Sequence, residues 1–363
     1  NTYESEYVAD LLEKAGYEIS SFDDECDIYI INTCTVTNQS DSKSKKIIRQ
    51  AVRRNPDSCV IAMGCFIEAN KDIQIDGVDI LLGNKDKSKI VELIEEWFKT
   101  RTVIRRLYSD LGTEFEDMEI RKTEGRTRAF VKIQDGCENY CTYCIIPYVR
   151  GKCRSKPMDK VLTEVKELLD NGYQEIVLTG IHTGNYGADL DYKFSDLLKE
   201  LVALDKLKRL RISSIEVTEL NDEVLDIIKN SNIICNHLHI PLQAGSNHVL
   251  KMMNRKYDLS YYENKIAEIR NIRKDISIST DIIVGFPGET EEDFQNTLDF
   301  AKKMKFSKIH AFPYSVRQNT AASKFPNQLD NSIKKERNHK LIKLSNQKSN
   351  YFNSNYSSYK IKY

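Results

Sequence analysis

Short apolar runs alternate with amphipathic segments along the first hundred residues. Tyr7, Val8, Leu11 and Leu12 recur at helical spacing and predict a helix with one dry face. The elements that follow are predicted as strands at 27–33, 59–64 and 78–83, and as helices at 42–54 and 87–99. Strands that alternate with helices favour a parallel sheet, so residues 1–100 are predicted to form a small α/β domain.

A second alternation begins at residue 128, after a charged and weakly periodic segment at 101–127. We predict that this segment is a linker with one edge strand. Apolar runs then predict six strands, at 128–134, 175–180, 209–214, 237–242, 278–286 and 308–314. Helical patterns lie between the later runs, at 158–169, 223–229, 261–273 and 291–304. Six such units are too many for a flavodoxin-like sheet and too few for an eightfold barrel. Residues 128–325 are therefore predicted to form a partial (β/α)6 barrel whose loops after the strands carry the chemistry.

The C-terminal segment, residues 326–363, differs from the rest in composition. From residue 331 onward it holds eight Lys or Arg against one Glu, and it is rich in Tyr. Positive charge and aromatic rings suit attraction to phosphates and stacking on bases. Over the whole chain Lys plus Arg and Asp plus Glu number 54 each, so the net charge indicates no class of partner. The cations of the helix at 42–55 favour either RNA contact or a solvated helix face.

Composition also bears on the compartment. No stretch approaches about 18 consecutive apolar residues, so no transmembrane helix is predicted. The first residues lack a basic region followed by an apolar one, so no secretory signal is predicted. Nine cysteines in such a chain favour reduced thiols or metal ligands over a disulfide framework. We therefore expect a cytoplasmic protein with no membrane partner.

Three of the nine cysteines lie within eight positions of the stretch DGCENYCTYCIIPYVRG: Cys137, Cys141 and Cys144. Gly136 and Pro147 argue against a regular helix here, so the cysteines are expected on a loop. Thiolates select zinc, copper(I) or iron–sulfur clusters, and structural zinc normally needs a second short knuckle that is absent nearby. A four-iron cluster on three cysteines leaves one iron free to bind a substrate. Structural zinc, a fourth ligand from Cys153 and inert buried thiols are the alternatives.

The spacing C-x3-C-x2-C, with Tyr143 before the last cysteine, resembles the cluster motif of the radical S-adenosylmethionine enzymes. The resemblance implies a 4Fe–4S cluster whose open iron is chelated by the amino and carboxylate groups of S-adenosylmethionine. Electron transfer cleaves the sulfonium in that superfamily and gives a 5′-deoxyadenosyl radical. It also implies that Tyr143 lies near the adenine and that no side chain acts as a catalytic acid or base.

Two further motifs are similar to those of the same superfamily. LTGIHTGNYG (178–187) falls where the loop after the second strand holds the methionine amino group. GFPGETEEDF (285–294) matches the fifth-strand motif beside the adenosine; alone, it would also fit a turn that caps a helix with an acidic first turn. The resemblance thus implies five more residues that bind the cofactor: Thr179, Gly180, Gly285, Pro287 and Gly288.

The N-terminal unit narrows the resemblance to the methylthiotransferases. Cys34 and Cys65 each follow a predicted strand, where α/β sites form, although buried small residues are the alternative. Methylthiotransferases carry an auxiliary 4Fe–4S cluster on an N-terminal α/β domain, held by three cysteines, and these two match the second and third. The first cysteine of the family's three belongs to a GC-x-x-N motif, and Asn1 resembles the last residue of that motif. The remaining ligand of the auxiliary cluster is therefore expected upstream of Asn1.

Four stretches most resemble the branch that acts on N6-threonylcarbamoyladenosine in tRNA: NTYESE, NTCTVTNQSD, LTGIHTGNYG and HIPLQAGSNHVLKMMNRKY. This implies transfer of a 2-methylthio group to that anticodon-loop adenosine, with one S-adenosylmethionine giving the methyl group and another the radical. The implied partners are tRNA, an electron donor such as flavodoxin or ferredoxin, and a sulfur source. A branch acting on isopentenyladenosine and one acting on a ribosomal protein are alternatives. A zinc-stabilised RNA-binding protein without activity is an alternative of another class.

The resemblance covers about residues 1–325. Family members continue into a small RNA-binding β-barrel, a TRAM domain, and YKIKY (359–363) resembles its first strand, cut short. Cys26, Cys59 and Cys235 are interpreted as packing residues, and Cys153 is expected to be partly exposed.

Two histidines alternate on the strand predicted at 237–242. His237 and His239 are two residues apart, so they are expected to share one face of the strand. His239 is expected either to point into the barrel or to be a satisfied core residue.

Overall fold

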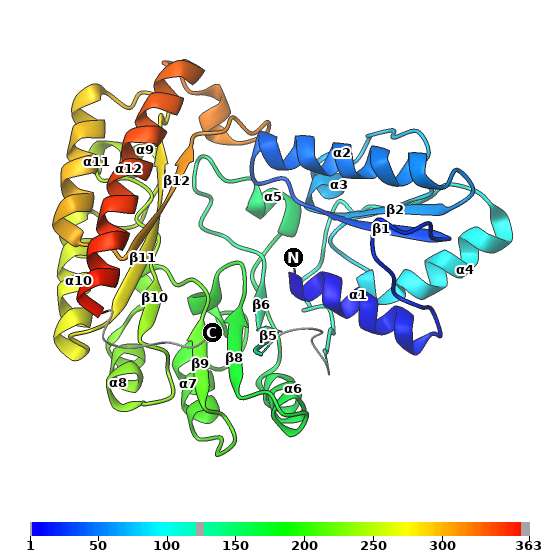
Figure 1. Cartoon of the computed structure of the whole chain (residues 1–363), viewed down its shortest axis with the longest axis horizontal. Coiled ribbons are helices and arrows are strands. Elements are labelled where there is room, and N and C mark those ends of the chain that lie inside the picture. The colour runs from blue at the N-terminus through cyan, green and yellow to red at the C-terminus, as the bar shows by residue number, and fades with distance from the viewer. Residues whose placement is uncertain (1, 121–126, 357–363) are drawn as a thin grey trace. The chain divides into compact units, whose positions relative to one another are not determined.

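The computed structural model describes residues 2–120 and 127–356, with side chains described to residue 347. It divides into two compact units (Figure 1). Unit 1 comprises Asn1–Asn139, Cys144–Ile176 and Tyr186–Asp191, and unit 2 comprises Tyr140–Tyr143, Val177–Asn185 and Tyr192–Tyr363. Asn1, part of the predicted linker and the predicted barrel strand at 359–363 lie outside the described residues.

Unit 1 contains a four-stranded parallel sheet in the order β1-β2-β3-β4. The strands are β1 (Ile28–Thr33), β2 (Cys59–Gly64), β3 (Ile80–Leu82) and β4 (Ile104–Arg106). All six residues of β2 are buried, because the strand lies between two neighbours and both faces of the sheet are covered. The predicted α/β domain is confirmed, and β4 is the edge strand expected within 101–127.

Helices cover both faces of this sheet (Figure 1). Ile61 and Met63 of β2 pack with one pair of helices, α1 (Thr2–Lys14) and α4 (Ile90–Thr100). The alternate residues Val60 and Ala62 pack with the other pair, α2 (Asn38–Arg54) and α3 (Cys65–Ala69). This alternation is the two-residue period of a strand buried on both sides.

The rest of unit 1 includes the elements that lead into and out of the cysteine loop. Its elements are η1 (Lys87–Lys89), β5 (Ala129–Lys132), β6 (Gln134–Asp135), α5 (Ile146–Arg150), β7 (Arg154–Ser155) and α6 (Met158–Asp170). Strands β6 and β7 form an antiparallel pair, so the chain leaves and returns on either side of the loop.

Unit 2 continues the alternation of strands and helices. Its strands are β8 (Glu175–Thr179), which begins in unit 1, β9 (Arg209–Ile212), β10 (His237–His239), β11 (Ser277–Val284) and β12 (Lys308–Pro313). The last three form a parallel sheet in the order β10-β11-β12. The helical elements are η2 (Thr183–Asn185), α7 (Phe194–Val202), η3 (Val217–Glu219), α8 (Asp222–Asn230), α9 (Asn247–Met252), α10 (Leu259–Ile272), α11 (Glu291–Met304), η4 (Ala321–Lys324) and α12 (Asn331–Tyr356). Each strand predicted after residue 170 is present, which confirms the predicted α/β class with parallel sheets.

The two faces of β11 differ in character. Ile278, Thr280, Ile282 and Val284 are fully buried on one face, whereas Asp281 on the other is partly exposed. The same alternation along the strand leaves a polar face, which carries Asp281.

Helix α12 packs beside β12 (Figure 1). The hydroxyl of Ser345 accepts a hydrogen bond from the N–H of Ile309 and donates one to its carbonyl oxygen, both at 3.0 Å. The contact satisfies backbone groups of the last strand in this sheet. The C-terminal segment thus begins as a packed helix. The predicted limits, 1–100, 101–127, 128–325 and 326–363, remain predictions.

None of the described helices has both the length and the apolar character needed to cross a membrane.

Candidate cluster sites

The cysteine loop between β6 and α5 depends on glycine. Gly136 has φ +75°, and a Cβ atom there would lie 1.9 Å from the carbonyl oxygen of Lys152, so only glycine fits. Helix α5 begins at Ile146, after Cys144. All three cysteines therefore lie outside regular helix, as predicted.

The middle of the loop belongs to unit 2 and is anchored through Thr142. The N–H of Thr142 donates to the carbonyl oxygen of Met253 at 3.1 Å, and its hydroxyl donates to that of Met252 at 2.8 Å. Its own carbonyl accepts from the N–H of Ala322 at 2.8 Å. Three bonds to one residue fix the backbone between the second and third cysteines.

A buried guanidinium faces the thiol of Cys141. Atom Nη1 of Arg255 lies 3.2 Å from Sγ of Cys141, and the Arg255 side chain is 4% exposed. Its Nη2 atom pairs with Glu216, and its Nε donates to the hydroxyl of Tyr257 at 3.2 Å. Burial opposes the charge, but Tyr143, Tyr257, Glu216 and Cys141 together raise the pKa of Arg255 well above its ordinary value. A permanent cation at this position stabilises a thiolate, which is the ligating form of cysteine.

Tyr143 packs on an apolar cluster that contains Phe286 of the GFPG motif. Phe286 is fully buried and makes edge-to-face contacts with Tyr314 and Phe325. Tyr143 of the cysteine loop and Phe286 of the GFPG motif therefore belong to one apolar cluster within unit 2.

The GFPG turn requires its glycines. Gly285 and Gly288 have φ of +72° and +82°, in the left-handed region. A Cβ atom at Gly285 would lie 2.5 Å from Cγ of Lys334. The N–H of Gly285 donates to Oε1 of Glu289 at 2.9 Å, and Arg337 of α12 holds the same oxygen at 2.6 Å. Helix α12 thus fixes the turn that carries the predicted cofactor contacts.

The other predicted cofactor contacts lie at or near strand ends. Thr179 is the last residue of β8, Gly180 follows it, and Pro287 is buried in the turn between β11 and α11. In the loop after β8, Nε2 of His182 contacts Oε1 of Glu219. Carboxyl ends of parallel strands are where α/β sites form, so these positions suit the predicted role, which stays a prediction.

Cys34 and Cys65 follow adjacent strands of the unit 1 sheet. Strands β1 and β2 pair in register with Thr33 opposite Gly64, so each cysteine comes directly after the last paired residue. Gly64 has φ +99°, and a Cβ atom there would lie 2.7 Å from Oδ1 of Asn32. The sheet therefore places both predicted ligands at one edge, as the sequence predicts.

Two side chains that no sequence motif predicted approach Cys65. Its Sγ atom lies 3.3 Å from Nε of Arg150 and 3.5 Å from Nδ2 of Asn84. The same Asn84 amide donates to the carbonyl oxygen of Val149 at 2.7 Å. The signal for Arg150 was a charged residue directly after the apolar segment IIPYV.

Arg150 belongs to a buried charge cluster. Its guanidinium lies 2.7 Å from Glu4 and 3.1 Å from Asp135, and Lys132 contacts the same two carboxylates at 2.7 and 2.8 Å. Lys87 lies 3.9 Å from Glu4. Burial opposes ionisation of Glu4, but Arg150, Lys132 and Lys87 hold its pKa well below the ordinary value. Cations outnumber the two carboxylates, so positive charge is in excess beside the thiol.

The thiol groups of these cysteines suit iron–sulfur clusters by their chemistry. Thiolates are the usual ligands of such clusters, and hydrogen bonds to the sulfurs and nearby charge set their properties. Cys65 and Cys141 each have an arginine nitrogen within 3.3 Å, which offsets the negative charge that thiolates bring.

The other cysteines pack in the protein. Cys59 is fully buried, and burial together with Asp79 raises the pKa of its thiol to about 12. Cys235 is buried, and the thiol of Cys26 contacts backbone carbonyls. The expectation that Cys153 is partly exposed is wrong: it is buried, and Nε2 of Gln134 donates to its Sγ at 3.2 Å because the β6–β7 pair encloses it.

Comparison with known proteins places the chain in a family. Residues 131–301 match the model of the Radical SAM superfamily, and residues 1–83 match that of the Uncharacterized protein family UPF0004. The chain is 44% identical to the threonylcarbamoyladenosine tRNA methylthiotransferase MtaB of Bacillus subtilis (strain 168), over 98% of this chain and 80% of that relative. The chain belongs to the radical S-adenosylmethionine methylthiotransferases. The predicted family and enzyme class are thereby confirmed, and its predicted cofactors, S-adenosylmethionine and 4Fe–4S clusters, are those of the family.

Other relatives of this methylthiotransferase fall in two groups. The MtaB of Thermotoga maritima is 41% identical over 93% of this chain and 77% of its own length. The tRNA-2-methylthio-N(6)-dimethylallyladenosine synthase of Moorella thermoacetica is 38% identical over 95% of this chain and 80% of its own length. In fold alone, the methylthiotransferase resembles the radical S-adenosylmethionine methyltransferase TsrM of Kitasatospora setae, solved with cobalamin and a [4Fe-4S] cluster bound. The TM-score is 0.65 at 14% identity, over 86% of this chain and 72% of that one.

Proposed function

We propose that this methylthiotransferase adds a 2-methylthio group to N6-threonylcarbamoyladenosine beside the anticodon of tRNA. The observation that carries the proposal is the 44% identity, over 98% of the chain, to a relative named for that substrate. The relatives named for dimethylallyladenosine are 35–38% identical, which makes that nucleoside the second candidate.

The residues present allow two cluster sites. Cys137, Cys141 and Cys144 would hold the reducing cluster, and Cys34 and Cys65 would supply two ligands of the auxiliary cluster. When bound, these clusters supply the electron that cleaves S-adenosylmethionine and the sulfur that is transferred.

The protein's own contribution is orientation and charge. Arg255 and Arg150 offset thiolate charge from fixed, buried positions, and each is held by carboxylates that keep it in place. Tyr143 offers an aromatic ring suited to packing near a purine. Gly285 and Gly288 allow the left-handed backbone of the turn that the proposal places beside the cofactor.

The proposed partners are tRNA, an electron donor such as flavodoxin or ferredoxin, and a sulfur source, in the cytoplasm. Support for RNA contact comes from α2, whose cations are all exposed: Lys43, Lys45, Lys46, Arg49, Arg53 and Arg54. An exposed row of cations is suited to phosphate contacts.

The substrate is tested by nucleoside mass spectrometry of tRNA. The full-length protein is expressed in a bacterial strain that makes both precursor nucleosides and lacks its own methylthiotransferases. We expect 2-methylthio-N6-threonylcarbamoyladenosine to appear while isopentenyladenosine stays unmodified. Methylthiolation of isopentenyladenosine alone would establish the second candidate. No modified nucleoside, together with zinc instead of iron in anaerobically purified protein, would favour the RNA-binding alternative.

A further inference from the structure

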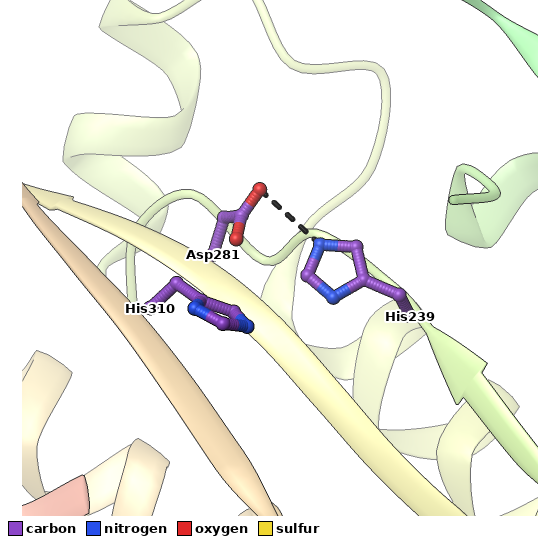
Figure 2. Close-up of side chains that lie close together, drawn as sticks. All are labelled: His239, Asp281 and His310. Carbon is purple, nitrogen blue, oxygen red and sulfur yellow. Dashed lines mark ion pairs between the residues drawn. The ribbon is translucent and has the colours of Figure 1, made fainter. Parts of the chain in front are cut away.

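Three neighbouring strands of unit 2 bring two histidines and an aspartate together. His239 ends β10, Asp281 lies in the middle of β11, and His310 lies on β12. The register pairs His239 with Ser279 and Asp281 with His310, so the side chains share one face of the sheet. Figure 2 shows the three side chains gathered over β11.

The three groups are close enough to share one ion. A ring nitrogen of each histidine and a carboxylate oxygen of Asp281 all lie within 4.8 Å of one another. Nε2 of His239 is 3.2 Å from Oδ2 of Asp281, and the centroids of the two imidazole rings are 5.7 Å apart. Among the described residues, no other group of three His, Cys, Asp or Glu side chains has its ligand atoms at this spacing.

The hydrogen bonds around His239 hold its ring in a ligating orientation. Its Nδ1 bonds to the hydroxyl of Ser279 at 2.9 Å, which turns Nε2 toward Asp281. A hydrogen bond at the far ring nitrogen is the usual support of a metal-ligating histidine. Ser279 is itself held, at 3.0 Å, by Nε2 of His237.

A simple ion pair explains only part of the arrangement. The bond between His239 and Asp281 makes no use of His310, and neither ring nitrogen of His310 has a hydrogen bond within the described part of the chain. His310 is exposed, and the Asp281 side chain is 30% exposed, so an ion can enter from solvent.

We propose that His239, Asp281 and His310 form a binding site for a divalent first-row transition metal. Two imidazoles and one carboxylate are a donor set that suits iron(II), cobalt(II), manganese(II) or zinc, and three protein ligands leave positions open for oxygen donors. A metal would bind through the lone pair on Nε2 of His239, and the one proton of the neutral ring would then lie on Nδ1, which donates to the Ser279 hydroxyl. None of its ligands is a cysteine, and the proposal does not rest on the proposed function.

Cobalt(II) is the probe, because its spectrum separates nitrogen and oxygen ligands from thiolates. The full chain, with its clusters reconstituted anaerobically and washed with chelator, is titrated with cobalt(II). We expect one further metal per chain, with visible ligand-field bands and no thiolate-to-cobalt charge transfer. His310→Ala and Asp281→Asn should each weaken binding about tenfold or more, and Ser279→Ala about tenfold.

His248→Ala is the matched control, because His248 also pairs with an aspartate, Asp293 at 3.0 Å, yet lies outside any described group of three ligands. It should leave cobalt affinity unchanged. His310 is exposed, so its replacement leaves the fold intact, which circular dichroism checks. Absence of binding, charge-transfer bands from thiolates, or equal affinity in His310→Ala and the parent protein would each overturn the proposal.

Discussion

Atom Nη1 of Arg255 lies 3.2 Å from the Sγ atom of Cys141, although 114 residues separate them in the chain. The arginine is buried and paired with Glu216, so it cannot turn away to solvent. A fixed cation therefore accompanies the central cysteine of the loop.

Arg255→Gln should slow formation of 5′-deoxyadenosine about tenfold or more. A hydrogen bond to a charged group contributes about 1.5–3 kcal/mol, and about 1.4 kcal/mol corresponds to a factor of ten. Arg255→Lys should recover part of the rate because the charge remains. Chromatography of the anaerobic reaction measures the product, and iron content confirms that the cluster is present.

Arg273→Gln is the control, since the hydrogen bonds described for Arg273 go to backbone carbonyl oxygens, at 2.8 Å in the case of Ile234. It should leave the rate nearly unchanged. A rate in Arg255→Gln equal to that of the parent protein would show that the guanidinium has no part in the function of Cys141.

The buried charge cluster beside Cys65 predicts a large loss of stability. Arg150→Met leaves Glu4 and Asp135 buried with fewer cations, and breaking such a pair costs about 3–5 kcal/mol in the free energy of unfolding. Lys14→Met removes an exposed partner of Asp10 and should change that free energy by less than about 1 kcal/mol. Urea unfolding of both variants decides the point, and equal losses would contradict the assigned role of Arg150.

Much of the fold was predictable because buried elements are marked by apolar residues over a short stretch of sequence. The strand 59–64 has the bounds predicted for it, since all its residues are buried and apolar or small. Helix α2 begins earlier than the predicted residue 42, because the hydroxyl of Thr37 accepts from the N–H of Ser40 and caps it. Packing of α12 on β12 was not foreseen, since Ser345 carries no hydrophobic signal.

The cysteines of the candidate site were predictable from spacing, but their electrostatic partners were not. Arg150 and Cys65 are 85 residues apart, and no local pattern links them. The same holds for His310, whose neighbours Asp281 and His239 lie on other strands. Contacts of this kind follow from strand register, which the sequence alone does not specify.

The exposed cations of α2 predict salt-dependent RNA binding. Replacing Lys45, Lys46, Arg49 and Arg53 with Ala should weaken tRNA binding. The slope of log affinity against log salt should also fall in magnitude, by up to about 0.9 for each phosphate that these cations neutralise. Filter binding at several salt concentrations measures both quantities.

Four exposed lysines of unit 2 provide the control: Lys302, Lys303, Lys305 and Lys308. Their replacement with Ala removes the same charge and should change the slope less. Equal effects of the two quadruple variants would assign α2 to a solvated face with no particular role in RNA contact.

His237 predicts a pH dependence of stability. Burial, with Arg211, His239 and His310, lowers its pKa from 6.5 to about 4. Between pH 6.5 and 4 the unfolded chain takes up a proton that the folded chain does not, so the free energy of unfolding falls as pH falls. His237→Gln should show a shallower fall over this range in urea unfolding. The same fall in both proteins would mean that His237 titrates normally.

The central claim is that the thiols of the cysteine loop hold the cluster that cleaves S-adenosylmethionine. Formation of 5′-deoxyadenosine by cysteine variants tests this claim most directly. Cys141→Ala and Cys153→Ser each remove one buried thiol of the same stretch, and both proteins are reconstituted anaerobically with iron and sulfide. We predict no 5′-deoxyadenosine above background with Cys141→Ala and undiminished formation with Cys153→Ser. Undiminished cleavage of S-adenosylmethionine by Cys141→Ala would contradict the assignment.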